Sequence, residues 1–278
     1  MWIGFARVKG AGPAPATRRL PLRRLALTLL VALPLSAASG QDVPQPASPR
    51  VAPPEALRDD ASKGPIRMEV LSPAETPPTF VMRGGPVGPA RLVFLHGMCG
   101  HGLGYAQSFQ FTAARRGILI APQGDKRCGG PWASWTGDLD ALDARIVDTF
   151  RRLGQADPID DIVVIGYSQG AMRAEDLVRR WPERYTRLVL MASPRVVSPR
   201  GFDLVRSTVM MAGERDRQDL MKQGAKALVR AGIPSTFMII PEATHGAMGP
   251  TPEKTMGEAL EWLFSHEVAR NSRSRKGT

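Results

Sequence analysis

Long apolar runs are missing from this 278-residue sequence. The clearest candidate, residues 25–35, covers 11 positions, whereas a helix that crosses a bilayer needs roughly 20 apolar residues. The sequence therefore predicts no stable membrane span. Metal-ligand clusters and correctly placed phosphate-binding glycine loops are also missing, so we expect neither a metal nor an organic cofactor.

A net charge of one sign is missing from the body of the chain, although the formal net charge is +11. Six of the 37 basic residues lie in residues 1–40 and four lie in residues 270–276, which leaves 27 basic residues against 26 acidic ones. The body offers no basic stripe that could follow a phosphate backbone. The sequence therefore predicts no nucleic-acid partner.

Both ends of the chain differ in composition from the middle. Residues 1–40 combine basic residues, the short apolar run and then small residues, which is the layout of an export signal with cleavage near residues 38–40. Residues 41–63 are rich in proline at their start and predict a linker, and residues 269–278 predict a basic disordered tail. We expect one exported domain over residues 64–268, in the periplasm or outside the cell.

Eight short β-branched or aliphatic runs and five helical stretches follow the linker. The expected strands are Ile66–Leu71, Thr79–Arg83, Arg91–Leu95, Ile118–Ala121, Ile162–Gly166, Arg187–Ala192, Ser207–Ala212 and Ser235–Ile240. The expected helices are Leu103–Arg116, Leu139–Leu153, Ala171–Trp181, Asp216–Ala231 and Glu253–Glu267. Because continuous apolar strands that alternate with helices form parallel sheets buried on both faces, the pattern predicts an eight-stranded, mostly parallel α/β sheet. The short connection at residues 193–206 leaves no room for a large lid.

A Gly-x-Ser-x-Gly motif surrounds Ser168. The strong strand at residues 162–165 ends directly before Gly166, and a helical pattern begins directly after Gly170. A tight strand-to-helix turn of this kind holds a serine Oγ above the sheet, where it can act as a nucleophile. The alternative is an ordinary serine in a glycine-lined turn.

The serine needs a base, and the base needs a carboxylate. His245 follows the last expected strand, where a catalytic histidine would project over the carboxyl edge of the sheet. Asp216 follows the seventh strand and gives the chain order Ser, Asp, His that is typical of such enzymes. Three other carboxylates compete for this role, namely Glu214, Asp219 and Asp203.

An oxyanion intermediate needs two N–H donors. We expect one from the backbone of Gln169 at the helix start and one from Met98 in the loop after the third strand, with Cys99 as the alternative. His96 is interpreted as a structural residue of that loop rather than as a catalytic one.

These motifs together resemble the α/β-hydrolase superfamily over residues 66–267. The segments Leu95-His96-Gly97-Met98-Cys99, Ala121-Pro122-Gln123-Gly124 and Cys128-Gly129-Gly130-Pro131-Trp132-Ala133-Ser134-Trp135 are similar to those of the secreted polyhydroxybutyrate depolymerase and feruloyl esterase group. Two departures are the cysteine one residue later after His-Gly and the three residues between Cys128 and Trp132. The Gly-Tyr-Ser-Gln-Gly-Ala segment also resembles carboxylesterases and acyl-thioesterases.

Cys99 and Cys128 are the only cysteines, and both follow expected strands at the same edge of the sheet. Since an exported chain meets oxidising conditions, we predict a disulfide that joins the two loops, with two free thiols as the alternative. Trp132, Trp135 and Tyr167 face this edge and could line a substrate pocket, whereas the tryptophans could equally anchor a long loop.

The sequence thus predicts an exported serine hydrolase that cleaves carboxylic esters, either small molecules or polymers. Two rivals remain open. A thioesterase or a peptidase would use the same three residues, and a catalytically silent member would bind ligands of the cell envelope.

Overall fold

The computed structural model describes residues 65–72, 76–84 and 89–268. The predicted export signal, linker and tail lie outside these residues. No helix among the described residues is long and apolar enough to cross a membrane.

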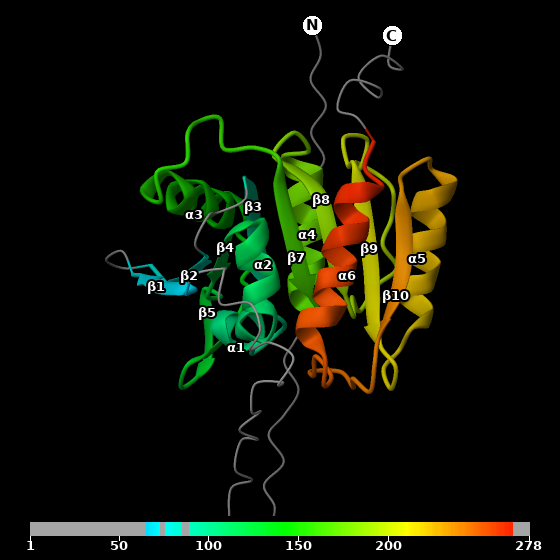
Figure 1. The fold of residues 1–278 in the computed structure, drawn as a ribbon, viewed down its shortest axis with the longest axis horizontal. Helices are drawn as coiled ribbons and strands as arrows, with labels where there is room; N and C mark the ends of the chain where they lie inside the picture. The colour runs from blue at the N-terminus through cyan, green and yellow to red at the C-terminus, as the bar shows by residue number, and fades with distance from the viewer. Residues whose placement is uncertain (1–64, 73–75, 85–88, 269–278) are drawn as a thin grey trace, which may run out of the picture. The chain divides into compact units, whose positions relative to one another are not determined.

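Eight strands form one sheet in the order β1-β2-β4-β3-β7-β8-β9-β10 (Figure 1). Their bounds are β1 Arg67–Leu71, β2 Thr79–Arg83, β3 Ala90–Leu95, β4 Gly117–Pro122, β7 Ile162–Tyr167, β8 Tyr185–Met191, β9 Ser207–Gly213 and β10 Ser235–Ile240. The pairs β1–β2 and β2–β4 are antiparallel, and the other neighbouring pairs of this sheet are parallel. The predicted eight-stranded, mostly parallel sheet is confirmed.

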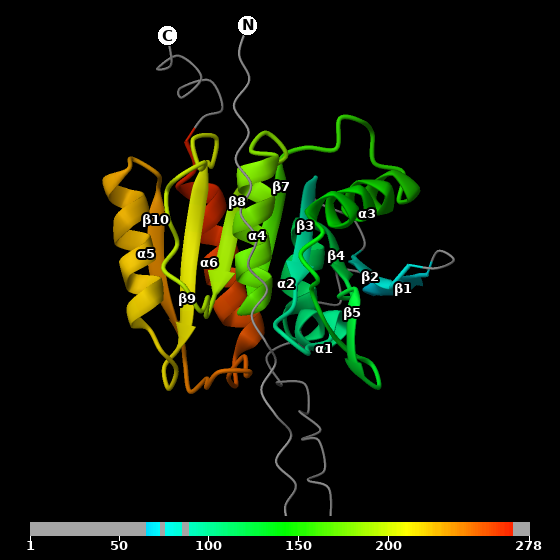
Figure 2. The ribbon, with the colours of Figure 1, turned by 180° about the vertical axis from the view of Figure 1, so that it is seen from behind.

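Helices cover both faces of this sheet. The face toward the viewer in Figure 1 carries α1 (Gly102–Ala106), α2 (Gln110–Arg116) and α6 (Pro252–Ser265). The opposite face, seen in Figure 2, carries α3 (Leu139–Arg152), α4 (Gln169–Arg180) and α5 (Asp219–Arg230). Since neither face is open to solvent, the central strands need apolar side chains on both of their faces.

The strand β3 shows how the sequence meets that demand. Leu92 and Phe94 point into the core under α1, α2 and α6, whereas Val93 and Leu95 point into the core under α3, α4 and α5. All four side chains are fully buried. Successive side chains of a strand alternate between faces, so a continuous apolar run fills both cores.

One predicted helix, Leu103–Arg116, is interrupted. It consists of α1, a short 3₁₀ turn at Gln107–Phe109 and α2. The Ser108 hydroxyl donates a hydrogen bond to the carbonyl of Tyr105 at 2.6 Å, and Phe109 leaves helical geometry with φ −133° and ψ 25°. Serine side chains compete in this way for backbone groups, a local effect that hydrophobic periodicity does not reveal.

The loops at the carboxyl edge of the sheet contain one element that the sequence did not predict. Residues 123–138, between β4 and α3, form a two-stranded hairpin of β5 (Lys126–Gly129) and β6 (Trp132–Ser134). Residues 192–206, between β8 and β9, contain no helix. The predicted absence of a large lid at that connection therefore agrees with the described chain.

Candidate active site

Ser168 occupies the turn between β7 and α4, as the motif predicts. Its backbone has φ 52° and ψ −112°, a region that residues other than glycine rarely adopt. The Ser168 N–H donates to the carbonyl of Met191 at 2.8 Å, and the Ser168 carbonyl accepts from Ala171 at 3.0 Å. The neighbouring strand and the new helix thus hold the strained residue in place.

The two glycines of the motif are required by close backbone approach. A Cβ atom on Gly166 would lie 2.6 Å from the Cα of Ala171, and a Cβ atom on Gly170 would lie 1.9 Å from the carbonyl oxygen of Leu95. Any side chain at either position would push α4 away from β7 or β3. The Gly-x-Ser-x-Gly pattern is therefore the steric condition for this turn.

His245 lies beside the serine and comes from the loop after β10. The N–H of Ala247 donates to the carbonyl of Thr244 at 3.1 Å, which closes a tight turn, and Gly246 supplies the positive φ of 91°. The His245 Nε2 lies 3.2 Å from the Ser168 Oγ, within hydrogen-bond distance. A base at this distance can accept the hydroxyl proton and make the oxygen nucleophilic.

Asp216 lies on the other side of the histidine, with its Oδ2 2.8 Å from the His245 Nδ1. Two of the rival carboxylates have other duties. The Glu214 side chain accepts from the N–H of Glu242 at 2.8 Å, and Asp219 is exposed and pairs with Arg217. Asp203 is exposed in the loop after β8. The structure therefore brings Asp216, His245 and Ser168 into one hydrogen-bonded series.

His96 has a different environment, fully buried in the loop after β3. Its Nδ1 lies 2.7 Å from the Gly97 carbonyl, and its Nε2 accepts the N–H of Gly124 at 2.9 Å. Since a backbone N–H can only donate, the Nε2 carries no proton and the Nδ1 carries it. Burial lowers the pKa of His96 to about 4 despite the opposing bond to Gly97. Both ring nitrogens are bonded to backbone groups, in agreement with the interpretation of His96 as a structural residue and not a catalytic one.

The two residues predicted to donate to the oxyanion belong to separate elements next to Ser168. Gln169 is the first residue of α4, where N–H groups have no acceptor within the helix and the helix dipole favours negative charge. Met98 follows Gly97, and a Cβ on Gly97 would lie 3.3 Å from the Cβ of Ser168. The loop after β3 thus passes directly beside the serine.

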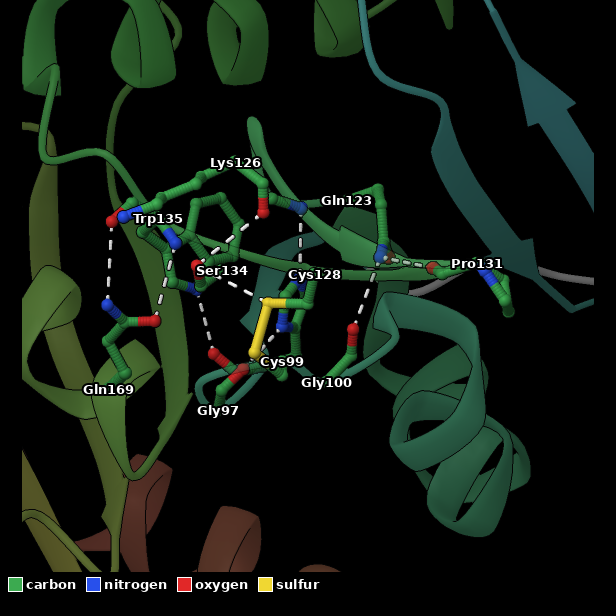
Figure 3. Close-up of a disulfide and its surroundings, with 12 residues drawn as sticks. Gly97, Cys99, Gly100, Gln123, Lys126, Cys128, Pro131, Ser134, Trp135 and Gln169 are labelled. Atoms are coloured by element: carbon green, nitrogen blue, oxygen red, sulfur yellow. Dashed lines mark hydrogen bonds between the residues drawn. A yellow bond between two sulfur atoms is a disulfide. The ribbon is translucent and has the colours of Figure 1, made fainter. Parts of the chain in front are cut away.

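Two side chains that hold this loop lie in the segment after β4 (Figure 3). The Gln123 side chain accepts from the N–H of Gly102 at 2.8 Å and donates to the carbonyl of Gly100 at 3.2 Å. The Trp135 indole donates to the carbonyl of His96 at 2.8 Å, and only 6% of Trp135 is exposed. Trp135 therefore anchors the loop, which is the second of the two roles that the sequence left open. The Pro-Gln segment at residues 122–123 was the sequence feature that could have indicated Gln123, although the role of Gln123 in holding the loop was not predicted.

A disulfide joins Cys99 to Cys128 with a Cα–Cα distance of 5.6 Å, as predicted (Figure 3). It connects the loop after β3 to the strand β5 of the hairpin. The N–H of Ala133 also donates to the Gly100 carbonyl at 3.0 Å. The hairpin and the loop beside Ser168 are therefore one crosslinked unit.

Replacing Cys99 and Cys128 together by serine is expected to lower the free energy of unfolding. The cysteines are 29 positions apart, and a crosslink across roughly 30 residues contributes about 3 to 4 kcal/mol by restricting the unfolded chain. Urea denaturation of oxidised wild type and of the variant measures the difference. Reductant should lower the stability of the wild type to that of the variant and leave the variant unchanged; equal midpoints without reductant would contradict the prediction.

The remaining aromatic residues differ in exposure. Trp132 is 51% exposed on the hairpin, and Met98 is 70% exposed on the loop to which the hairpin is crosslinked. Tyr167 is 3% exposed, and its ring packs against Tyr105 and His245 instead of facing solvent. Of the three residues considered for a substrate pocket, Trp132 alone offers a large open apolar surface.

The described residues contain no group of three or more His, Cys, Asp or Glu side chains that could hold a metal ion. The ionisable side chains beside Ser168 are instead engaged with one another or with the backbone. The arrangement provides a hydroxyl, a base, an acid and candidate N–H donors, which are the components of acyl transfer.

Neither a protein-family profile nor a curated protein matches the sequence. Solved structures do match the fold. A fluorophosphonate-binding serine hydrolase of Staphylococcus aureus aligns with a TM-score of 0.52 at 12% identity, over 72% of this chain and 98% of that one. Carboxylesterase CesB of Bacillus subtilis aligns with a TM-score of 0.52 at 13% identity, over 73% and 93% of the two chains. The S-formylglutathione hydrolase of Staphylococcus aureus aligns with a TM-score of 0.52 at 12% identity, over 72% and 97%. The chain therefore has the expected α/β-hydrolase fold.

Proposed function

We propose that this protein is a serine hydrolase that cleaves carboxylic esters through an acyl-enzyme. The observation that carries the proposal is the series of contacts from Asp216 Oδ2 to His245 Nδ1 at 2.8 Å and from His245 Nε2 to Ser168 Oγ at 3.2 Å. The strained turn at Ser168 supports it, because such a turn exposes the oxygen above the sheet.

The reaction follows from these positions. His245 takes the proton of Ser168 as the Oγ attacks the acyl carbon, and Asp216 stabilises the imidazolium that forms. His245 then gives the proton to the leaving alkoxide, which departs as the alcohol and leaves the acyl group on Ser168. Water, deprotonated by His245, attacks the acyl-enzyme, and His245 then returns the proton to the Ser168 Oγ as the bond to the acyl group breaks and the acid is released.

The negative charge of each tetrahedral intermediate needs stabilisation. The backbone N–H groups of Gln169 and Met98 are the proposed donors, because one opens α4 and the other lies in the loop that passes Ser168. The Gln169 side chain supports this arrangement through its hydrogen bonds with the backbone of Trp135, at 3.3 and 3.4 Å. The same side chain thereby links the helix start to the segment that anchors the oxyanion loop.

The substrate class is proposed to be an ester with an apolar acyl group. Large exposed apolar side chains stand on three loops at the carboxyl edge of the sheet, namely Met98 after β3, Trp132 after β4 and Val196 after β8. Exposed apolar surface beside a catalytic group is suited to binding an acyl chain. The connection after β8 carries no helix that would cover it.

Replacing Trp132 by alanine is expected to lower kcat/KM for nitrophenyl octanoate about tenfold more than for nitrophenyl acetate, because only the longer chain reaches the lost apolar surface. Steady-state kinetics with acetate, butyrate and octanoate esters measure the difference. Phe111→Ala is the matched control, since Phe111 is 41% exposed on α2 outside the carboxyl-edge loops. Equal losses on all three esters would refute a role for Trp132 in binding the acyl chain.

The activity itself is tested with matched ester, thioester and anilide substrates on the mature protein. Preference for the ester supports the proposal, whereas preference for the thioester or the anilide would indicate a thioesterase or a peptidase with the same residues. A folded protein that cleaves none of them and does not react with a fluorophosphonate would instead be a binding protein.

Export is part of the proposal. The basic and apolar leader at residues 1–40 and the disulfide between Cys99 and Cys128 support it, because structural disulfides persist mainly in oxidising compartments.

A further inference from the structure

His245 lies in an unusual setting for a residue that must be placed accurately. Its side chain is 54% exposed, and it projects from a loop with no regular secondary structure. The contact with Asp216 fixes one ring nitrogen and leaves the position of the loop itself unexplained. Since an error of about 1 Å in placement can reduce a rate about a hundredfold, something must hold this loop.

Two tyrosines form hydrogen bonds with Gly246, the residue that follows His245. The Tyr105 hydroxyl donates to the Gly246 carbonyl at 2.7 Å, and the Tyr167 hydroxyl accepts the Gly246 N–H. These two groups belong to successive peptide units, so the backbone is held on both sides of the Gly246 Cα. The two hydroxyls thus supply hydrogen-bond partners for the backbone of this loop, as a neighbouring strand does for a residue within a sheet.

The two rings support each other. They stack with centroids 5.1 Å apart and an angle of 20° between planes, and the Tyr167 ring also lies 5.6 Å from the imidazole of His245. Tyr167 is the last residue of β7 and directly precedes Ser168 in the chain, whereas Tyr105 belongs to α1. The end of β7 therefore positions both the nucleophile, which follows Tyr167 in the chain, and the base, whose loop is hydrogen-bonded to Tyr167.

Burial keeps both phenols protonated. It raises the pKa of Tyr167 to about 12, with the neighbouring Tyr105 and Asp216 acting in the same direction and the bond from Gly246 opposing them. Burial also raises the pKa of Tyr105. Neither hydroxyl ionises over the range in which a histidine serves as a base, so the two hydrogen bonds persist there.

We propose that Tyr105 and Tyr167 are positioning residues that hold the imidazole of His245 over Ser168 through the backbone of Gly246. The proposal rests on the proposed function, because it assigns a role within that reaction. It assigns Tyr167, which precedes the nucleophile, and Tyr105 of α1 an effect on the rate of the reaction that does not require contact with the substrate.

The test compares Tyr105→Phe, Tyr167→Phe and the double variant with the wild type. We expect each single variant to lower kcat about tenfold while KM stays within about twofold, because the lost bond affects placement of the base and not binding. The double variant should lose much less than the product of the two single effects, since both hydroxyls hold the same glycine.

Tyr185→Phe is the matched control. Its hydroxyl donates to Asp143 at 2.6 Å in the core under α3, α4 and α5, away from His245. We expect this variant to lose thermal stability and to keep its kcat. If Tyr105→Phe, Tyr167→Phe and the double variant lose activity only in proportion to the fall in melting temperature, the two tyrosines are merely structural and the proposal is wrong.

A spectroscopic measurement separates the proposal from its premise. The proton between His245 Nδ1 and Asp216 should give a far-downfield proton resonance in the wild type, and this resonance should broaden or shift in Tyr105→Phe but not in Tyr185→Phe. An inactive wild type would refute the proposed function. An active wild type with unchanged kcat and resonance in Tyr105→Phe would refute only the positioning role. Tyr105 is half-buried, so this variant carries the test even if Tyr167→Phe fails to fold.

Discussion

Replacing Ser168 by alanine is expected to lower kcat for nitrophenyl esters by about a million-fold, the loss typical of removing the nucleophile of a triad. The substitution deletes the only side-chain atom of Ser168 that meets His245, at 3.2 Å. It keeps the Cβ that packs beside Gly97. The variant should therefore fold with the stability of the wild type and differ in chemistry alone.

The second readout of that variant is covalent labelling. A fluorophosphonate probe should modify the wild type at one site, which peptide mapping assigns to Ser168, and should leave Ser168→Ala unmodified. Ser193→Ala is the matched control, because Ser193 is buried in the loop after β8 and contacts Glu175 rather than His245. Ester hydrolysis that survives in Ser168→Ala would show that another residue is the nucleophile.

Replacing Asp216 by asparagine is expected to lower kcat by about ten-thousand-fold with little change in fold. The carboxylate accepts a hydrogen bond from the His245 Nδ1, so the Nε2 is left free to take the serine proton. A carboxamide can donate to the Nδ1 instead, which places the imidazole proton on Nε2, where it faces Ser168. The base would then be present in the wrong tautomer.

The control for this prediction is Asp219→Asn. Asp219 is three residues further along the chain and pairs with Arg217 in solvent, so its loss should change kcat by less than about twofold. A large loss in Asp219→Asn or in Glu214→Gln, together with an active Asp216→Asn, would transfer the role of the acid to one of these rivals.

Much of the fold follows from local sequence. The apolar run at residues 162–165 and the two glycines at 166 and 170 sufficed to predict the strand, the turn and the helix around Ser168, because each requirement is local and steric. Similarly, Asp216 could be expected to lie near His245, since both follow strands that run in parallel and end at the same edge.

The hairpin β5–β6 and the tyrosine pair could not be predicted in the same way. Residues 129–131 are Gly-Gly-Pro, which indicates a loop, and the hairpin is held to the loop after β3 by the disulfide and by the bond from Ala133 to Gly100. Tyr105 meets Gly246 across 141 positions of sequence. A bond of that span depends on how α1 packs against the sheet, and no pattern around Tyr105 reports it.

The imidazole of His96 has a consequence for how the site moves. By donating to Gly97 and accepting from Gly124, the ring acts as one more rung of the ladder between β3 and β4, beyond the point where the two strands separate. The loops that follow β3 and β4 are thereby joined by a hydrogen bond close to the ends of the two strands. The loop that carries Met98, the proposed oxyanion donor, should therefore move together with the hairpin and not independently of it.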